Sequence, residues 1–304
     1  MPGSQFAFHG PDGERLLGRR WLPLERPRAI VQIAHGLAEH SARYGRLAGA
    51  LNAAGYGVYA GDLRGHGPSA APADLGHFAD AGGWSKCVGD LWSLNRVIAA
   101  EQAAPIVFLG HSLGSFLGRD FVAQRSDALA GAAFSGSNGR PPAIATLGRL
   151  IARAERLRLG PRGKSSLIFK MWFGDFNKPF APARTPFDWL SRDPKEVDAY
   201  VADPLCGFPF SNQLAIDVLD ALPRVTARES LSAVRRDMPI YVFSGERDPV
   251  GSNLKGFIDD LKAAGFTRLT TRIYPGARHE TLNETNRDEV TTDLIAWLNS
   301  VVGK

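Results

Sequence analysis

The sequence is poor in cysteine and contains no long apolar run. Its 304 residues include two cysteines, Cys87 and Cys206, which lie far apart and form neither a metal-ligand spacing nor a disulfide framework. We therefore expect two free thiols in a reducing compartment. No apolar run approaches the roughly 18 residues that a membrane-spanning helix requires. These absences argue against a disulfide-stabilised scaffold and against an integral membrane protein.

Targeting, repetitive and nucleic-acid-binding patterns are also missing. The first ten residues have no cationic region followed by a long apolar stretch, so we expect no secretory signal and predict a cytoplasmic location. The formal net charge of +5 admits an anionic partner, but no recognised nucleic-acid-binding motif accompanies it. We therefore expect no nucleic-acid partner. The sequence indicates no oligomeric state.

Short apolar runs alternate with amphipathic stretches along most of the chain, which predicts an α/β fold with a mostly parallel, doubly wound sheet of eight strands. A hairpin is expected first, from segments 6–8 and 15–22 around a turn at 10–13. The other expected strands are 29–34, 57–60, 105–109, 130–134, 239–244 and 267–274, and the expected helices are 44–54, 84–103, 113–124, 252–265 and 287–301.

The alternation stops between residues 137 and 234. This stretch is rich in proline, aromatic residues and arginine and contains helix-like pieces. It is best explained as a mainly helical cap inserted between two strands of the sheet. The predicted organisation is therefore a core at 1–136, a cap at 137–234, and the second part of the core at 235–304.

The most informative motif is Gly110-His-Ser-Leu-Gly114, which lies between an expected strand and an expected helix. A serine at the apex of a sharp strand-to-helix turn is similar to the nucleophile elbow of α/β-hydrolases. A Cβ atom at Gly110 or Gly114 would crowd the crossing of strand and helix. Ser112 is therefore the candidate nucleophile.

A serine hydroxyl needs a histidine to take its proton and a carboxylate to orient that histidine. Asp248 and His279 follow Ser112 in the chain order of α/β-hydrolases, each just after an expected strand. Taken alone, Asp248 is more readily explained as a turn former or helix cap than as a catalytic residue. Taken alone, His279 is likewise more readily explained as a solvated loop residue. Of the alternative histidines, His9, His66 and His77 precede the serine, which is the wrong order, and His111 lies inside the elbow and would point away from the hydroxyl. The joint match favours Ser112, Asp248 and His279 as a catalytic triad.

Acyl transfer also needs hydrogen-bond donors for the oxyanion, and losing one such donor typically costs about 10²–10³ in rate. We assign the backbone N–H groups of Leu113, which follows the serine, and of Leu37, which follows the strand 29–34. Gly36 permits close approach of the backbone to substrate. His40 lies near this loop and is expected to shape it.

The chain resembles the monoacylglycerol lipase and lysophospholipase branch of the α/β-hydrolase superfamily. The resemblance covers about 10–135 and 235–303, and its most specific segments are His35-Gly-Leu-Ala-Glu-His40, Ser41-Ala-Arg-Tyr44, Asp62-Leu-Arg-Gly-His-Gly67-Pro-Ser69 and the elbow. It implies a serine hydrolase of lipid-like carboxylic esters, with no cofactor or metal, and a mobile cap over an apolar acyl tunnel. The cap departs from that of the mammalian enzymes. Two of its segments, 173–178 and 185–190, look closer to bacterial lysophospholipase-like proteins.

The expected substrate is a monoacylglycerol or a lysophospholipid, cleaved through an acyl-enzyme intermediate. On the same triad, the alternatives are a general short-chain carboxylesterase, a thioesterase or an acyltransferase. A non-catalytic ligand-binding protein of the same fold is an alternative of another class, against which the complete triad argues. The candidate substrate-binding residues are His35, Gly36, His111, Phe169, Trp172 and Phe173.

The cap carries a strong positive charge between residues 140 and 170, where eight lysines or arginines face one acid, Glu155. Apolar residues recur there at helical spacing, and Arg149, Arg153 and Arg156 fall on another face of the same helix. Such a helix can rest on an anionic membrane surface. The favoured alternative is a helix whose apolar face packs on the core and whose charged face is solvated. The aromatic residues at 169–176 line either an acyl pocket or the cap's own small core.

Overall fold

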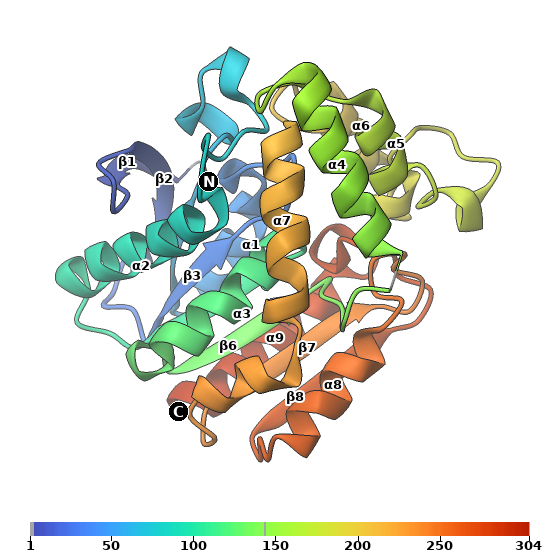
Figure 1. Cartoon of the computed structure of the whole chain (residues 1–304). Coiled ribbons are helices and arrows are strands. Elements are labelled where there is room, and N and C mark those ends of the chain that lie inside the picture. The colour runs from blue at the N-terminus through green and yellow to red at the C-terminus, as the bar shows by residue number, and fades with distance from the viewer. Residues whose placement is uncertain (1–2, 143, 304) are drawn as a thin grey trace.

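One sheet runs through the middle of the molecule (Figure 1). The computed structural model describes residues 3–142 and 144–303. The sheet has the strand order β1-β2-β4-β3-β5-β6-β7-β8, with β1, β2 and β4 paired antiparallel and the remaining neighbours parallel. Its strands are β1 (Ser4–His9), β2 (Arg15–Trp21), β3 (Ile30–Ala34), β4 (Gly57–Gly61), β5 (Ile106–His111), β6 (Gly131–Ser135), β7 (Ile240–Gly245) and β8 (Leu269–Tyr274).

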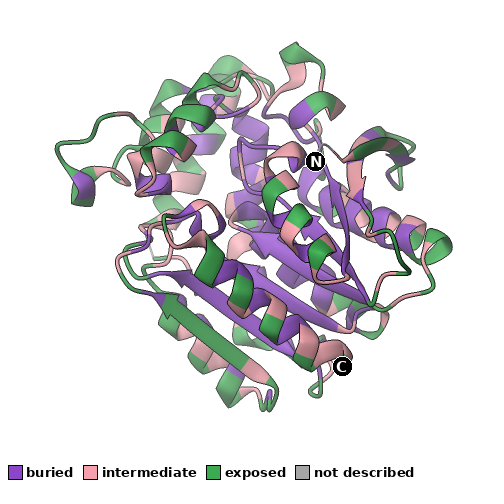
Figure 2. Ribbon diagram, turned by 180° about the vertical axis from the view of Figure 1, so that it is seen from behind, coloured by how far each residue is buried: buried purple, intermediate pink, exposed green. Residues whose placement is uncertain are grey.

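The central strands are buried on both faces, which explains their continuous apolar sequences. Successive side chains of a strand point to opposite faces, so Phe108 enters one core while Val107 and Leu109 enter the other. Helices α1 (Gly45–Ala53) and α9 (Arg287–Val302) cover one face, and α2 (Gly83–Glu101), α3 (Leu113–Arg125) and α8 (Leu254–Ala263) cover the other. The edge strand β8 is largely exposed (Figure 2).

The predicted fold class is therefore confirmed: the chain is an α/β protein with an eight-stranded, mostly parallel sheet. The hairpin and every expected strand and helix of the core occur, with ends that differ by a few residues. One difference lies before α1, where a short 3-10 turn, Ser41–Tyr44, precedes a helix that begins at Gly45.

The described residues between β6 and β7 form four α-helices and three short 3-10 helices, and no strand. The α-helices are α4 (Ala145–Leu159), α5 (Ser166–Phe173), α6 (Pro194–Ala202) and α7 (Asn212–Val225). Figure 1 shows α4, α5 and α6 beyond one end of the sheet, while α7 runs down beside α2 and α3. We call residues 137–234 the cap segment; its boundaries and its role as a cap remain our proposal.

We expected α4 to pack its apolar face on the core and to leave its charged face in solvent, and this orientation is wrong. Arg149 and Arg153 turn toward α7 and form ion pairs with Asp220, at 2.8 Å and 3.2 Å. The apolar residues lie outward instead, with Leu147 53% exposed and Leu157 85% exposed. The apolar stripe of an amphipathic helix usually faces the neighbouring element, but here the face with the arginines contacts α7 through ion pairs.

Candidate active site

Ser112 occupies a strained turn between β5 and α3. Its backbone has φ of 51° and ψ of −119°, a conformation that side-chain-bearing residues rarely adopt. The two glycines of the motif make this turn possible: a Cβ at Gly110 would lie 2.5 Å from the carbonyl oxygen of Gly114, and a Cβ at Gly114 would lie 2.2 Å from that of Ala34. The strand-turn-helix context predicted for the motif is therefore present.

Asp248 and His279 come from the loops after β7 and β8 and meet in a buried hydrogen bond. Nδ1 of His279 lies 2.8 Å from Oδ1 of Asp248, and both side chains are at most 2% exposed. The carboxylate is fixed on two further sides, because Oδ1 accepts the Val250 N–H at 2.9 Å and Oδ2 accepts the Ser244 hydroxyl at 2.9 Å. The carboxylate can therefore hold the imidazole in one tautomer and one orientation.

The two groups shift each other's ionisation. Burial raises the pKa of Asp248, but the imidazole of His279 and the hydrogen bonds to the carboxylate outweigh burial, so the pKa lies below its ordinary value. Burial lowers the pKa of His279, but the carboxylate of Asp248 outweighs it, so the pKa lies above its ordinary value. The arrangement stabilises a positive charge on the imidazole, as a general base requires when it takes a proton.

The loop after β3 passes directly beside the serine. A Cβ at Gly36 would lie 3.2 Å from the Cβ of Ser112, so only a glycine lets the loop approach this closely. Leu37 follows in this loop and lines the same cavity as Ser112. Leu113 opens α3, where first-turn N–H groups have no partner within the helix. Both assigned oxyanion donors thus belong to segments that border the serine.

A cavity of about 820 Å³ lies above these loops, between the core and the cap segment. Ser112 and His279 both line it, and Asp248 lies behind His279 without reaching its wall. The other predicted site residues that line it are Gly36, Leu37, His111, Leu113, Trp172 and Phe173. Helices α5 and α7 add mainly apolar side chains to its wall, including Leu167, Ile168, Met171, Val218, Leu219 and Leu222.

Two predicted substrate-binding residues, His35 and Phe169, do not line the cavity. Both ring nitrogens of His35 are engaged by backbone: Nδ1 lies 2.8 Å from the Gly36 carbonyl, and Nε2 accepts the Leu63 N–H at 2.9 Å. Phe169 packs edge-on against Phe173 at a ring separation of 5.1 Å. Trp172 and Phe173 therefore lie on the cavity, whereas Phe169 packs against the hydrophobic cluster that the cap segment shares with α2 and α3.

His111 lines the cavity beside the catalytic candidates. Its ring centroid lies 4.8 Å from that of His279, and its Nδ1 lies 3.3 Å from the Ser135 hydroxyl. Burial, followed by the nearby His279, lowers the pKa of His111 to about 4. His111 is therefore neutral at physiological pH and cannot compete with His279 for a proton.

Sequence reasoning missed a buried ionic network behind the loop. Arg43 pairs with Glu39 at 2.7 Å and with both carboxylate oxygens of Glu280 at 2.7 Å. Glu39 also accepts the Gly36 N–H at 2.6 Å. The network thus ties the loop that carries Leu37 to the loop that carries His279. Glu39 and Arg43 stand in the segments that carried the family resemblance, but nothing in the sequence indicated their partner Glu280.

The cap segment also holds this loop. Ala38 has φ of 56°, in the left-handed region that alanine seldom occupies. Its carbonyl oxygen accepts two hydrogen bonds from the cap segment, from the Tyr200 hydroxyl at 2.8 Å and from the Gly207 N–H at 2.9 Å. His40, two residues further on, pairs with Asp203 at 2.9 Å. The predicted role of His40 in shaping the loop agrees with these contacts.

Comparisons with known proteins agree with this architecture. The family described as serine aminopeptidase, S33, matches residues 25–286. A monoacylglycerol lipase of Mycolicibacterium smegmatis is 30% identical, over 98% of this chain and 97% of its own length. Human monoglyceride lipase is 27% identical over 96% of this chain and 88% of its own length. Among solved structures, a thermostable carboxyl esterase from Bacillus coagulans superposes with a TM-score of 0.90 at 27% identity, covering 100% of both chains.

The chain belongs to the serine aminopeptidase S33 family, whose match spans most of its length. The predicted resemblance to the monoacylglycerol lipase branch of the α/β-hydrolases is confirmed. No helix in the described ranges is both long and apolar enough to cross a bilayer.

Proposed function

We propose that Ser112, His279 and Asp248 form the catalytic triad of a serine hydrolase that cleaves monoacylglycerols or lysophospholipids. The broader prediction, a carboxylic ester hydrolase of lipid-like substrates, is confirmed by the relatives described above. One observation carries the assignment of the residues. The buried His279–Asp248 hydrogen bond of 2.8 Å lies beside a cavity whose wall includes both His279 and the strained Ser112.

In this proposal, Oγ of Ser112 attacks the acyl carbonyl while its proton passes to Nε2 of His279. The N–H groups of Leu37 and Leu113 stabilise the oxyanion, and the negative charge of Asp248 stabilises the imidazolium. The bond to the alcohol then breaks, and His279 returns the proton to the leaving oxygen. Water, deprotonated by His279, attacks the acyl-enzyme and releases the fatty acid. No cofactor enters these steps.

The walls of the cavity support a lipid substrate. Most of the lining contributed by the cap segment is apolar, and the volume of about 820 Å³ accommodates an acyl chain. The enzymes of similar sequence act, by their names, on monoacylglycerols. The acyl chain would lie along Trp172 and Phe173, with the ester at Ser112. A short-chain esterase would use the same triad but would not need this apolar volume.

Labelling and hydrolysis test the proposal together. A fluorophosphonate probe should label the wild-type chain and the control Ser232→Ala, whose exposed hydroxyl bonds only to the Glu229 carbonyl, but not Ser112→Ala. The same proteins are then compared on monoacylglycerols of graded length, lysophosphatidylcholine, short nitrophenyl esters and an aminoacyl anilide. Retained turnover in folded Ser112→Ala contradicts the triad, and a sharp preference for the shortest esters or for the anilide contradicts the lipid substrate.

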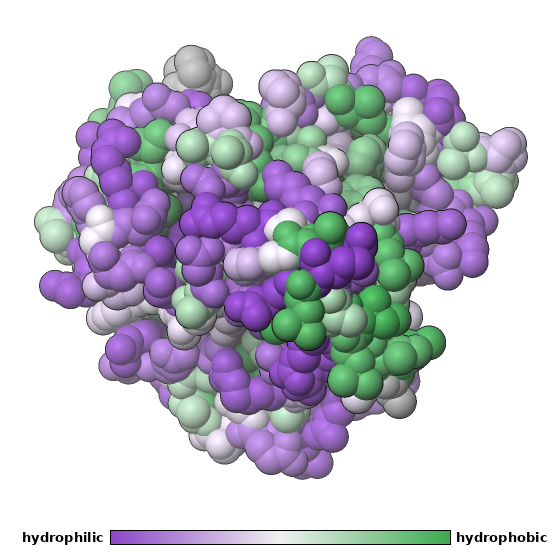
Figure 3. All heavy atoms as spheres, turned by 45° about the horizontal axis from the view of Figure 1, so that its top comes forward, coloured by the Kyte–Doolittle hydropathy of each residue, from purple (hydrophilic) through white to green (hydrophobic). Residues whose placement is uncertain are grey.

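We also propose that the cap segment rests on a lipid surface while substrate enters. Figure 3 shows a continuous hydrophobic area at the lower right of its view. In α4, in α5 and at the residue before α4, the exposed large apolar side chains are Ile144, Leu147, Leu150, Leu157, Leu159, Leu167 and Met171. Three of them, Ile144, Leu167 and Met171, also line the cavity, as does Lys170. An apolar surface that continues into the cavity and carries a cation suits an anionic bilayer. The reducing, cytoplasmic setting expected from the two thiols is part of this proposal.

Vesicle binding tests the surface. The double variant Leu147→Ser/Leu150→Ser should bind vesicles of phosphatidylcholine and phosphatidylglycerol more than tenfold more weakly than the wild type, because losing roughly 1 kcal/mol of apolar burial per leucine corresponds to that factor. Leu24→Ser is the matched control, since Leu24 is fully exposed elsewhere on the chain. Equal binding by the double variant and the wild type contradicts the proposal, as does an equal loss in the control.

A further inference from the structure

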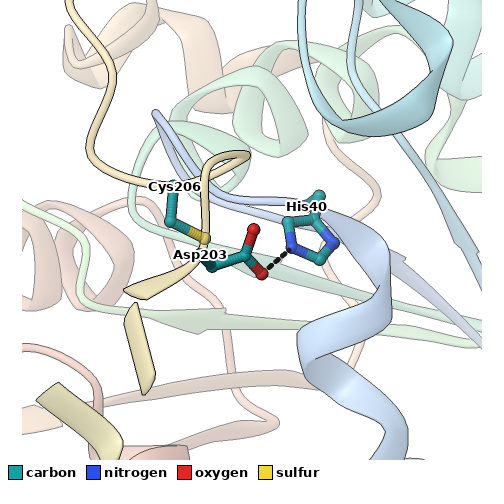
Figure 4. Close-up of side chains that lie close together, drawn as sticks. All are labelled: His40, Asp203 and Cys206. Atoms are coloured by element: carbon teal, nitrogen blue, oxygen red, sulfur yellow. Dashed lines mark hydrogen bonds and ion pairs between the residues drawn. The ribbon is translucent and has the colours of Figure 1, made fainter. Parts of the chain in front are cut away.

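A histidine, an aspartate and a cysteine lie together where the cap segment meets the loop after β3 (Figure 4). Nε2 of His40 lies 2.9 Å from Oδ2 of Asp203. One donor atom from each of His40, Asp203 and Cys206 lies within 4.8 Å of the other two. None of the three lines the cavity above Ser112, and none has a part in the proposed reaction.

A tight turn after α6 places two of these side chains on one side of the backbone. Oδ1 of Asp203 accepts the Leu205 N–H at 2.8 Å, and the Asp203 carbonyl accepts the Cys206 N–H at 3.0 Å. Figure 4 shows Cys206 and Asp203 pointing toward His40, which comes from the other segment. The three donors therefore converge from two parts of the chain that are 163 residues apart.

The surrounding charges favour a cation at this point. The charged groups that act on Cys206 and Asp203 include the guanidinium of Arg43 and the carboxylates of Glu39 and Glu280. Together with Asp203 itself, three carboxylates face one guanidinium, so the neighbourhood has an excess of negative charge. A cation bound here would stabilise the thiolate form of Cys206.

We propose that His40, Asp203 and Cys206 form a binding site for Zn²⁺, with water as the fourth ligand. Imidazole nitrogen, thiolate sulfur and carboxylate oxygen are the donors that zinc takes, at about 2.0–2.3 Å, which places tetrahedral donors roughly 3.3–3.8 Å apart. The separations in the structure reach this arrangement with movements of about 1 Å. The Asp203 side chain is 32% exposed, which leaves room for the water.

Binding at this site redistributes two protons. The thiol of Cys206 loses its proton to solvent as the Sγ–Zn bond forms. His40 coordinates through Nε2 and carries its proton on Nδ1, an atom that is buried and has no hydrogen-bond partner among the described residues. Zinc-ligating histidines usually donate this second N–H, and loss of such a contact weakens binding by roughly 10- to 100-fold. The site is therefore weaker than a structural zinc site, and its occupancy responds to zinc concentration.

Bound zinc would cross-link the turn at 203–206 to the loop that carries Leu37. The cross-link would add to the two hydrogen bonds that Ala38 already accepts from Tyr200 and Gly207. Zinc would in this way restrain the cap segment without touching the serine.

Cobalt substitution tests the site directly. Reduced, chelator-treated chain is titrated with Co²⁺, which should bind at one equivalent and give intense tetrahedral visible bands together with thiolate-to-cobalt absorption in the near ultraviolet. One equivalent of Zn²⁺ should abolish both. Cys206→Ser should lose the thiolate absorption, and Asp203→Asn should bind at least tenfold more weakly. Cys87→Ser is the matched control, because Cys87 is a buried thiol in α2, and it should behave as the wild type.

Hydrogen exchange provides a second measurement that does not depend on cobalt. Zinc should slow exchange of the amides at 203–207 in the wild type and in Cys87→Ser, but not in Cys206→Ser. No thiolate absorption in the wild type overturns the proposal, as does the same absorption in Cys206→Ser or its loss in Cys87→Ser. If circular dichroism shows that Cys206→Ser does not fold, the test rests on Asp203→Asn. Binding of Co²⁺ by Asp203→Asn as tightly as by the wild type would then overturn the proposal.

Discussion

Replacing Asp248 with asparagine removes the charge that His279 faces while keeping the shape of the site. Oδ1 of Asp248 accepts hydrogen bonds from both His279 and the Val250 N–H, so the amide oxygen of asparagine should occupy that position. The amide NH₂ then faces the Ser244 hydroxyl, which can accept a hydrogen bond. The histidine should therefore keep its orientation, and the variant isolates the electrostatic contribution.

The expected loss follows from the separation of the charges. With charge centres about 4 Å apart and an effective dielectric constant of about 20, a carboxylate stabilises an imidazolium by about 4 kcal/mol. Each 1.4 kcal/mol corresponds to a factor of ten, so kcat should fall by about 10³-fold. The measurement is kcat on a monoacylglycerol and on a short nitrophenyl ester. Asp237→Asn, at an exposed carboxylate paired with Arg235, is the control and should retain wild-type kcat.

The pH dependence of the rate gives an independent check. As the proposed base, His279 must be neutral to act, so the wild-type rate should fall as the pH drops through its raised pKa. Without the Asp248 carboxylate, burial lowers the pKa of His279 against only the weaker influence of Glu280 and Glu39, so the acid limb should move to lower pH while the plateau falls. A folded Asp248→Asn variant with a plateau within threefold of the wild type and an unmoved acid limb would refute the reasoning.

Three further variants test the framework of the site by denaturant unfolding. Ser112→Gly should abolish turnover yet raise the free energy of unfolding by about 1 kcal/mol, because glycine relieves the positive φ; equal or lower stability would show that the turn is unstrained. Gly114→Ala should lower the free energy of unfolding by about 2–3 kcal/mol, because the new Cβ meets the Ala34 carbonyl. The control Gly49→Ala has open space around the new Cβ and should not lower it. An unchanged unfolding midpoint for Gly114→Ala would contradict the close crossing of strand and helix. Arg43→Met should cost about 3–5 kcal/mol at pH 7, since Glu39 and Glu280 remain buried without a cation. Burial then raises the pKa of each carboxyl, so the loss should shrink as the pH falls through those values, and a loss independent of pH would contradict the ionic network.

The sheet and the turn around Ser112 were predictable because their signals are local. A strand buried on both faces, such as β3, is visible in the sequence as an apolar run. The sharp turn is visible as a serine with a glycine two residues away on each side. Asp248 and His279 could be proposed because open α/β sheets place such residues after their strands.

Contacts between distant segments were not predictable. The apolar stripe of α4 gave no sign that its arginines would face Asp220, some 70 residues away, because periodicity identifies a face but not its neighbour. Phe169 and Phe173 lie one helical turn apart, yet only Phe173 reaches the cavity. Similarly, the spacing of the two cysteines argued against a metal site, whereas the fold brings Cys206 and the nearby Asp203 to a histidine from a distant segment.

The strained alanine at position 38 would link the proposed oxyanion pocket to the position of the cap segment. A left-handed conformation costs an alanine roughly 1–2 kcal/mol, and the two hydrogen bonds to its carbonyl contribute about that much together. If Leu37 donates to the oxyanion as we propose, loss of the contacts from Tyr200 and Gly207 would let the peptide relax and move the Leu37 amide from its working position. The open molecule would then admit substrate but be chemically idle, even toward a small water-soluble ester that needs no tunnel.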